Sequence, residues 1–144
     1  MSWIDYRKEL DFVPDSPAFV ERGRLRDLSE TLAKLGFRVA EVLFDNDAPN
    51  GERRLLADLT SALGAATAHA GSWPVFNDRL WDVLTSEDKA PIAVVIIGLD
   101  SMVKKNLHGF VKIVHNLLSL TEGVGLQSGE ANRQVAYFFV GSWG

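Results

Sequence analysis

The spacing of apolar residues predicts helices and strands that alternate along most of the chain. Apolar positions repeat at helical spacing over about 25–35, 52–63, 73–85 and from Asp100 or Ser101 to about Leu120. Strand-type runs rich in β-branched and aromatic residues occupy 37–44, 92–97 and 134–140. This order predicts an α/β fold: a small, mostly parallel sheet of about three strands with helices packed on it.

The pattern weakens at the N-terminus and before the last strand. Residues 1–20 contain apolar side chains without a clear period, and Pro14 and Pro17 interrupt any helix, so we expect an arm lying on the domain. The polar segment 121–133 is expected to be a flexible connector. We therefore predict a single domain over 1–144, made of an N-terminal extension at 1–36 with one extra helix and a core at 37–140.

The predicted helix at 73–85 has two distinct faces. Its core stripe is expected to contain Phe76, Leu80, Val83 and Leu84. The opposite face carries Asp78, Asp82 and Thr85, flanked by Trp81 on one side and Arg79 on the other.

The two acids on that face repel one another. Carboxylates at i and i+4 cost a few tenths of a kcal/mol, and Asp82 lies too far into the helix to gain much from its dipole. The pair beside a large aromatic side chain indicates an acidic patch prepared for a cationic partner. An ordinary solvated face explains the same spacing equally well.

Composition narrows the class of partner. The net charge of −4 argues against direct contact with nucleic acid and permits attraction to a basic protein. The chain has no cysteine, which excludes disulfides and thiolate metal sites. Neither a signal-peptide pattern nor an apolar run of membrane-spanning length is present, so we expect a cytoplasmic protein without a membrane partner.

One motif suggests an enzyme. Asp45 and Asp47 follow a predicted strand as Asp-x-Asp, which resembles the opening motif of haloacid-dehalogenase-like phosphohydrolases, where the first acid attacks phosphate beside magnesium. The next residues, Ala48 and Pro49, depart from that motif, and the remaining chain is too short for that fold. We therefore expect no catalytic residue and no enzymatic activity.

Metal and cofactor sites also lack support in the sequence. The histidines His69, His108 and His115 are scattered, and the last two lie about 10.5 Å apart along one helix, too far to share a metal without another ligand between them. The chain contains no glycine-rich phosphate-binding motif. We expect neither a metal nor a cofactor.

Leu-Trp-Asp-Val-Leu-Thr at 80–85, preceded by Asp78, resembles the recognition-helix motif of the barstar family, small intracellular inhibitors of secreted ribonucleases. The predicted elements over 37–140 follow the order of that family, from the first strand through the aromatic loop to the last strand.

The resemblance implies a function and a site. It implies that Asp82 is the central contact in a ribonuclease active site, where helix carboxylates take the place of RNA phosphates, and that Asp78 is a second contact. Trp73 and Ser72 occupy the corresponding loop, and we expect Trp81 and Thr85 to join the same partner-binding surface. The expected partner is a basic ribonuclease or a related toxin, for which this chain would be the immunity protein or antitoxin.

Several positions depart from the family. Asn116 or His115 stands where the family's prototype has a glutamate in its third helix, Pro74 replaces a loop glycine, and Glu87 replaces a tryptophan. The target implied by the resemblance is therefore a different nuclease or a toxin of another kind. The alternative is an interaction module of the same fold whose partner is not a nuclease.

Overall fold

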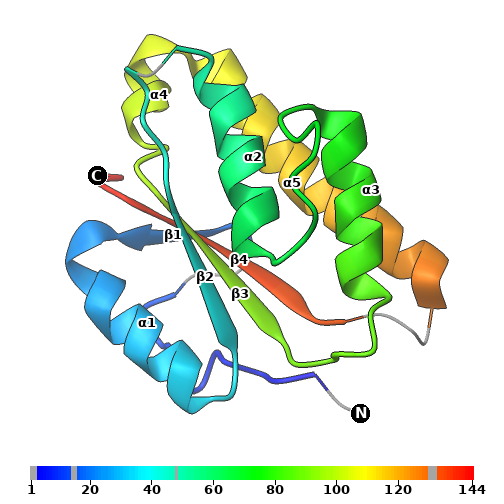
Figure 1. The fold of residues 1–144 in the computed structure, drawn as a ribbon. Coiled ribbons are helices and arrows are strands. Elements are labelled where there is room, and N and C mark those ends of the chain that lie inside the picture. The colour runs from blue at the N-terminus through cyan, green and yellow to red at the C-terminus, as the bar shows by residue number, and fades with distance from the viewer. Residues whose placement is uncertain (1–2, 14–15, 48, 130–132) are drawn as a thin grey trace.

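The protein is built around an all-parallel sheet. The computed structural model describes residues 3–13, 16–47, 49–129 and 133–144. Its four strands lie in the order β1-β4-β3-β2 (Figure 1). Their bounds are β1 Ala18–Glu21, β2 Arg38–Leu43, β3 Ile92–Ile97 and β4 Val135–Gly141. The predicted α/β class is confirmed, with four described strands instead of about three.

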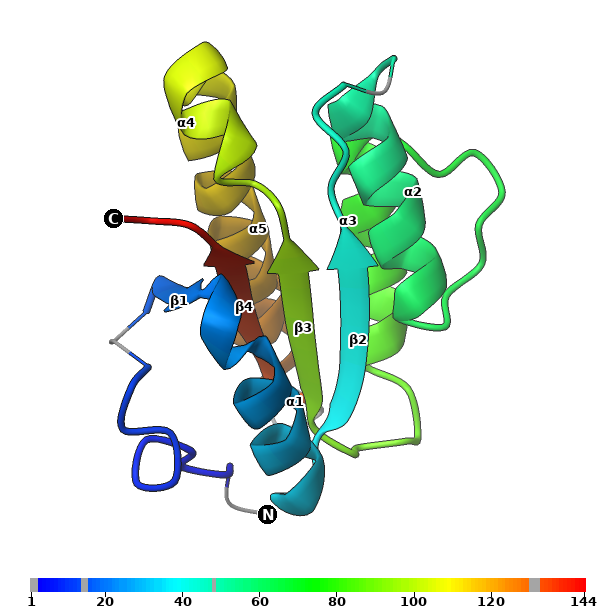
Figure 2. The same ribbon diagram turned by 90° about the vertical axis from the view of Figure 1, so that its left-hand side faces the viewer.

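Helices cover both faces of the sheet (Figures 1 and 2). One face is covered by α1 (Leu25–Lys34), which follows a short 3-10 turn, and the other by α2 (Gly51–Ala62), α3 (Trp73–Leu84) and α5 (Leu107–Ser128). The short helix α4 (Ser101–Lys105) connects β3 to α5. Within the described residues, none of the helices combines the length and the hydropathy that crossing a membrane requires.

Strand β3 shows why the sheet is buried on both sides. Ile92, Val94 and Ile96 pack toward α2, α3 and α5. Ala93 and Val95, which alternate with them, pack toward α1 and the N-terminal segment. A strand that is apolar at every position is typical of a parallel sheet between helical layers. The strand predicted at 92–97 is confirmed.

The N-terminal extension contains its one predicted helix, which is α1, but the segment expected to be an arm also supplies a strand of the sheet. Strand β1 pairs with β4, with Ala18 opposite Phe138. Upstream of β1, Leu10 is fully buried against the face of the sheet that α1 covers. Pro17 stands directly before the strand, where its missing N–H costs nothing, while Pro14 lies outside the described residues.

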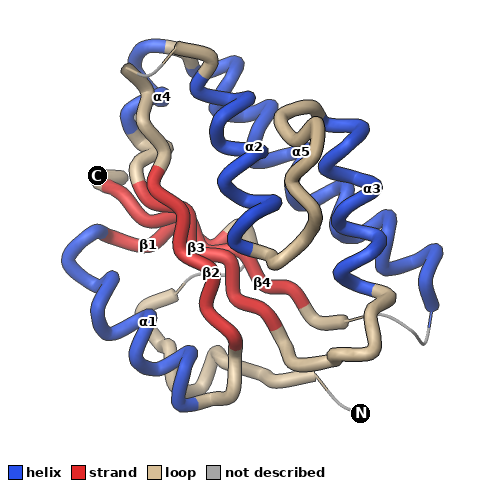
Figure 3. Tube along the Cα trace, in the orientation of Figure 1, coloured by secondary structure: helices blue, strands red, loops and turns tan. Residues whose placement is uncertain are grey.

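The long helix predicted from Asp100 or Ser101 to Leu120 is divided in two (Figure 3). The break is at Asn106, whose φ of −153° and ψ of 70° are not helical. The Asn106 side chain accepts a hydrogen bond from the backbone N–H of Gly109 at 3.0 Å and so caps α5. Val103 and Leu107, on either side of the break, are exposed, although both continue the apolar spacing from which the single helix was predicted.

Helix α5 also continues beyond its predicted end. Residues 121–128 are helical instead of forming a connector, and residues 130–132 of that predicted connector lie outside the described residues. Val124 is buried on the core side of this added segment. Packing of Val124 therefore compensates for the low helix propensity of the neighbouring glycines, Gly123 and Gly125.

Candidate functional site

Helix α3 presents the two faces that its sequence predicts. Its inner face contains four buried side chains, which are Phe76, Leu80, Val83 and Leu84. The helix begins after Ser72, whose hydroxyl accepts a hydrogen bond from the N–H of Val75 at 3.4 Å, and Pro74 lies in its first turn. The burial of these four side chains confirms the orientation that the apolar spacing predicts for the helix.

The outer face of α3 carries the predicted acids. Asp78 and Asp82 are both exposed, as is Trp81 between them. The only ion pair of either acid with a described residue joins Asp82 Oδ2 to Arg79 Nη1 at 3.7 Å, and the Asp82 side chain remains 63 % exposed. An exposed pair at that distance contributes little to stability, so both carboxylates are accessible to a partner.

The other predicted contact residues have partners within the protein. The Trp73 indole N–H donates to Glu52 Oε1 at 3.1 Å, and its ring packs edge-on against Phe76. The Thr85 hydroxyl donates to the carbonyl of Trp81 at 2.7 Å at the end of α3. Together with the capping role of Ser72, these contacts show that Trp73, Ser72 and Thr85 fix the helix in place.

Glu52 connects the three helices around the start of α3. Besides the bond from Trp73, its carboxylate lies 3.2 Å from the Lys112 ammonium of α5, and Glu52 itself belongs to the first turn of α2. The sequence did not predict this contact, because Glu52 is separated from Trp73 by 21 positions and from Lys112 by 60. The contacts of Glu52 orient the N-terminal end of α3.

A hollow of about 380 Å³ lies next to Asp82 and brings basic side chains close to the acids. Its lining includes Arg38, Asp88 and Arg133. The Arg133 side chain is almost fully buried; its Nε donates to the carbonyl of Ala90 and its Nη2 lies 3.4 Å from Asp88 Oδ2. The surface around Asp82 is therefore of mixed charge, which the spacing within α3 alone did not predict.

The electrostatics of this hollow follow from those contacts. The backbone N–H of Ala90 donates to Asp88 at 2.9 Å and, with the positive charges of Arg133 and Arg38, lowers the pKa of the Asp88 carboxyl. Burial lowers the pKa of the Arg133 guanidinium, an effect that Asp88 opposes. Asp88 is thus held as a carboxylate beside Arg133.

Helix α5 provides no acid at the position compared with the family's third-helix glutamate. Asn116 is half-buried, and His115 is exposed with its Nε2 3.4 Å from the Ser119 hydroxyl. The next acid along the helix is Glu122, in the segment that was predicted to be a connector. Glu122 lines a different pocket from Asp82.

The acids of the enzymatic alternative stabilise a turn. Asp45 Oδ1 accepts a hydrogen bond from the N–H of Asp47 at 3.0 Å, just after β2. Asp47 is exposed and lies 3.9 Å from the Lys105 ammonium. Among the described residues, no group of three or more His, Asp or Glu side chains is arranged to hold a metal.

Comparison with known proteins identifies no family for this arrangement: no protein-family model matches the chain, and no curated protein matches its sequence.

Proposed function

We propose that this chain is a barstar-like intracellular inhibitor of a ribonuclease or nuclease-type toxin, which it blocks with the acidic face of α3. The support comes first from the order of elements. Strands β2, β3 and β4 are adjacent and parallel, and α2 and α3 lie between the first two along the chain. This is the order of elements that the resemblance to the barstar family implies over 37–140.

The observation that carries the proposal is the outward position of Asp78 and Asp82 on a helix whose other face is buried. A ribonuclease active site binds RNA phosphates with basic side chains, and a carboxylate that meets an arginine fork there forms charge-assisted bonds about twice as strong as neutral ones. Attraction between opposite charges also accelerates encounter. In the proposed complex Asp82 makes the central contact, which its exposure and that of the neighbouring Trp81 support.

The mixed charge around Asp82 favours a second candidate, an interaction module whose partner is not a nuclease. Arg38 and Arg79 lie near or beside that acid, and a uniformly basic active site would meet them at a cost. A partner with both acidic and basic side chains fits such a surface. The two functions use the same face of α3 and differ in the target.

The test is inhibition of RNA cleavage by a panel of secreted basic ribonucleases, including any that is encoded beside this chain's gene. We expect Asp82→Ala to weaken inhibition by about 2–5 kcal/mol, the range for truncating a buried interfacial charge, a range to which the family's prototype itself contributed. Titration of enzyme activity with wild type and variant gives the two inhibition constants.

Asp58→Ala is the matched control, because Asp58 is an exposed acid on α2 and no ion pair joins it to a described residue. It should inhibit as wild type does. Equal inhibition constants for wild type and Asp82→Ala would end the proposal. Binding of a non-nuclease protein that requires Asp82, without inhibition of any nuclease, would establish the second candidate.

A further inference from the structure

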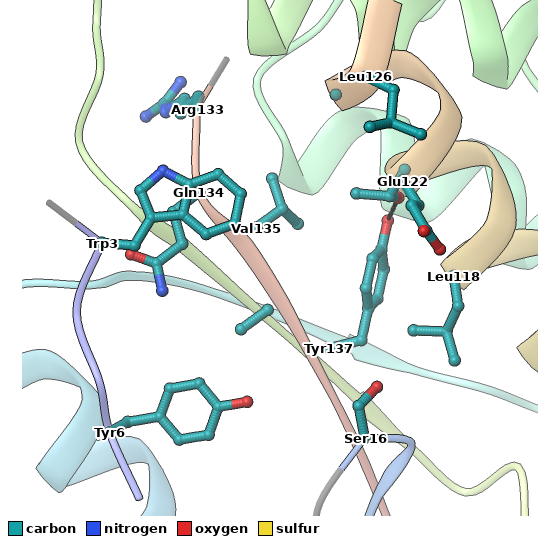
Figure 4. A pocket seen from close by; sticks show the side chains of 13 residues that line it. Trp3, Tyr6, Ser16, Leu118, Glu122, Leu126, Arg133, Gln134, Val135 and Tyr137 are labelled. Carbon is teal, nitrogen blue, oxygen red and sulfur yellow. Dashed lines mark hydrogen bonds between the residues drawn. The ribbon is translucent and has the colours of Figure 1, made fainter. Parts of the chain in front are cut away.

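A pocket of about 500 Å³, shown in Figure 4, has no residue of α3 in its lining. The N-terminal segment supplies Trp3 and Tyr6, the C-terminal half of α5 supplies Leu126, and the start of β4 supplies Tyr137. The volume is within the range of sites that hold small organic molecules. No residue predicted to contact the nuclease lines it.

Two large apolar side chains are exposed at its rim. Trp3 is 57 % exposed and Leu126 is 78 % exposed. Figure 4 shows Trp3 on the left of the view and Leu126 at the upper right, with the ring of Tyr137 below Leu126. A bound apolar body would therefore remove both side chains from water at once, which is the main source of affinity in such pockets.

The other polar groups in the lining are mostly occupied by the protein itself. The Gln134 side chain exchanges two hydrogen bonds with the backbone of Ile4, at 2.8 and 3.0 Å. The Tyr137 hydroxyl bonds to Thr121 at 2.8 Å. Arg133 is directed toward Asp88 and so faces the neighbouring hollow.

Glu122 differs from these groups. It lines the pocket beside Tyr137 and is exposed, and no described residue forms an ion pair with it. Aromatic rings attract cations through their faces, and a carboxylate beside them adds an opposite charge. A ligand carboxylate would instead be repelled by Glu122.

We propose that this pocket binds a small organic cation with a flat apolar body, an arylalkylamine in chemical class. The apolar body lies between Trp3 on one side of the pocket and Leu126 and Tyr137 on the other, and the ammonium group is directed toward Glu122. This site is independent of the proposed inhibition, because α3 contributes no residue to it.

The experiment compares three probes of one shape: 4-phenylbutylamine, 4-phenylbutanol and 4-phenylbutyrate. Each is titrated into the full chain at pH 7 and followed by backbone amide NMR shifts. We expect saturable shifts at the pocket residues, with the amine binding about three- to tenfold more tightly than the alcohol and the butyrate most weakly. Glu122→Gln should reduce the affinity for the amine to that for the alcohol, and Trp3→Ala should weaken binding of both.

Glu87→Gln is the control, because Glu87 is an exposed acid outside the pocket. It should leave all three affinities unchanged. The proposal is overturned by the absence of saturable shifts at the pocket, by butyrate binding as tightly as the amine, or by an unchanged amine affinity in Glu122→Gln. Since none of these variants alters α3, such a result leaves the inhibitor proposal standing.

Discussion

The fold strongly changes the ionisation of Tyr137. Its ring is buried beneath α5, and burial raises its pKa to about 12, an effect that the hydrogen bond with Thr121 partly opposes. Below about pH 10 the side chain is neutral in the folded and the unfolded chain. Between about pH 10 and 12 only the unfolded chain loses the proton, so stability falls as pH rises through this window.

We expect Tyr137→Phe to reduce the fall in the free energy of unfolding between about pH 10 and 12. At pH 7 the variant should be less stable by about 1 kcal/mol, because the hydrogen bond to Thr121 is lost. Above pH 10 the wild type should lose up to about 1.4 kcal/mol per pH unit more than the variant. Urea unfolding from pH 8 to 11.5 measures both slopes, and parallel curves would contradict the assignment.

At this scale the sequence predicted buried side chains better than it predicted contacts. The apolar period of α3 identified its inner face, including Phe76 and Leu80, and the outward position of Asp82 followed from the same period. The hydrogen bond of the Trp73 indole could not be predicted, because its acceptor, Glu52, belongs to another helix. The apolar period identifies the buried face of one helix and does not predict which residues of other helices lie beside it.

Among the elements, α5 contains three glycines, of which Gly109 and Gly123 lie in contrasting surroundings. A Cβ on Gly123 would meet nothing within 4 Å. A Cβ on Gly109 would lie 2.5 Å from Asn106 Nδ2, in the side chain that caps the helix, and 2.9 Å from Met102 Cε. The same substitution therefore acts on helix propensity alone at one position and on the cap at the other.

We expect Gly123→Ala to stabilise the protein by about 0.5–1 kcal/mol through helix propensity. Gly109→Ala should destabilise it, because displacing Asn106 removes a cap worth about 1 kcal/mol and crowds Met102. Chemical denaturation of the two variants beside wild type measures the difference. A stabilising Gly109→Ala would show that Asn106 does not determine the start of α5.

The division between α4 and α5 was beyond prediction from apolar spacing. The positions Val103, Leu107 and Phe110 continue one helical stripe across Asn106, and asparagine inside a helix is only mildly unfavourable. In the folded chain, the hydrogen bond that Asn106 Oδ1 accepts from the Gly109 N–H separates α4 from α5. Such a local bond competes with the helix without changing the hydrophobic pattern.

For the molecule as a whole, the N-terminal extension completes the second face of the sheet. Leu10, Ala18 and Val20 are buried there with Leu28 and Leu32 of α1. The α/β class and the strands β2, β3 and β4 could be predicted from the alternation of elements. The edge strand β1 could not, because its four residues are too few to show a period.

This arrangement predicts that the extension contributes to global stability. Leu10→Ala should cost about 2–5 kcal/mol, since Leu10 is fully buried in the layer beneath α1. Leu43→Ala, at an exposed position of β2, should change stability by about 0.5 kcal/mol or less. Thermal unfolding of both variants tests the contrast; similar melting temperatures would mean that the segment around Leu10 is dispensable.

The four tryptophans occupy separate environments, and intrinsic fluorescence can therefore distinguish regions of the molecule. Trp143 packs on Phe19 and donates its indole N–H to the backbone carbonyls of Val20 and Phe139, which shields it from collisional quenchers. Trp81 and Trp3 are both exposed, and Trp81 lies beside the carboxylates of Asp78 and Asp82, which repel iodide but not neutral acrylamide. In a Trp3→Phe variant the ratio of the two quenching constants therefore gives an optical measure of the net charge around Trp81, and a protein bound to α3 would lower both constants.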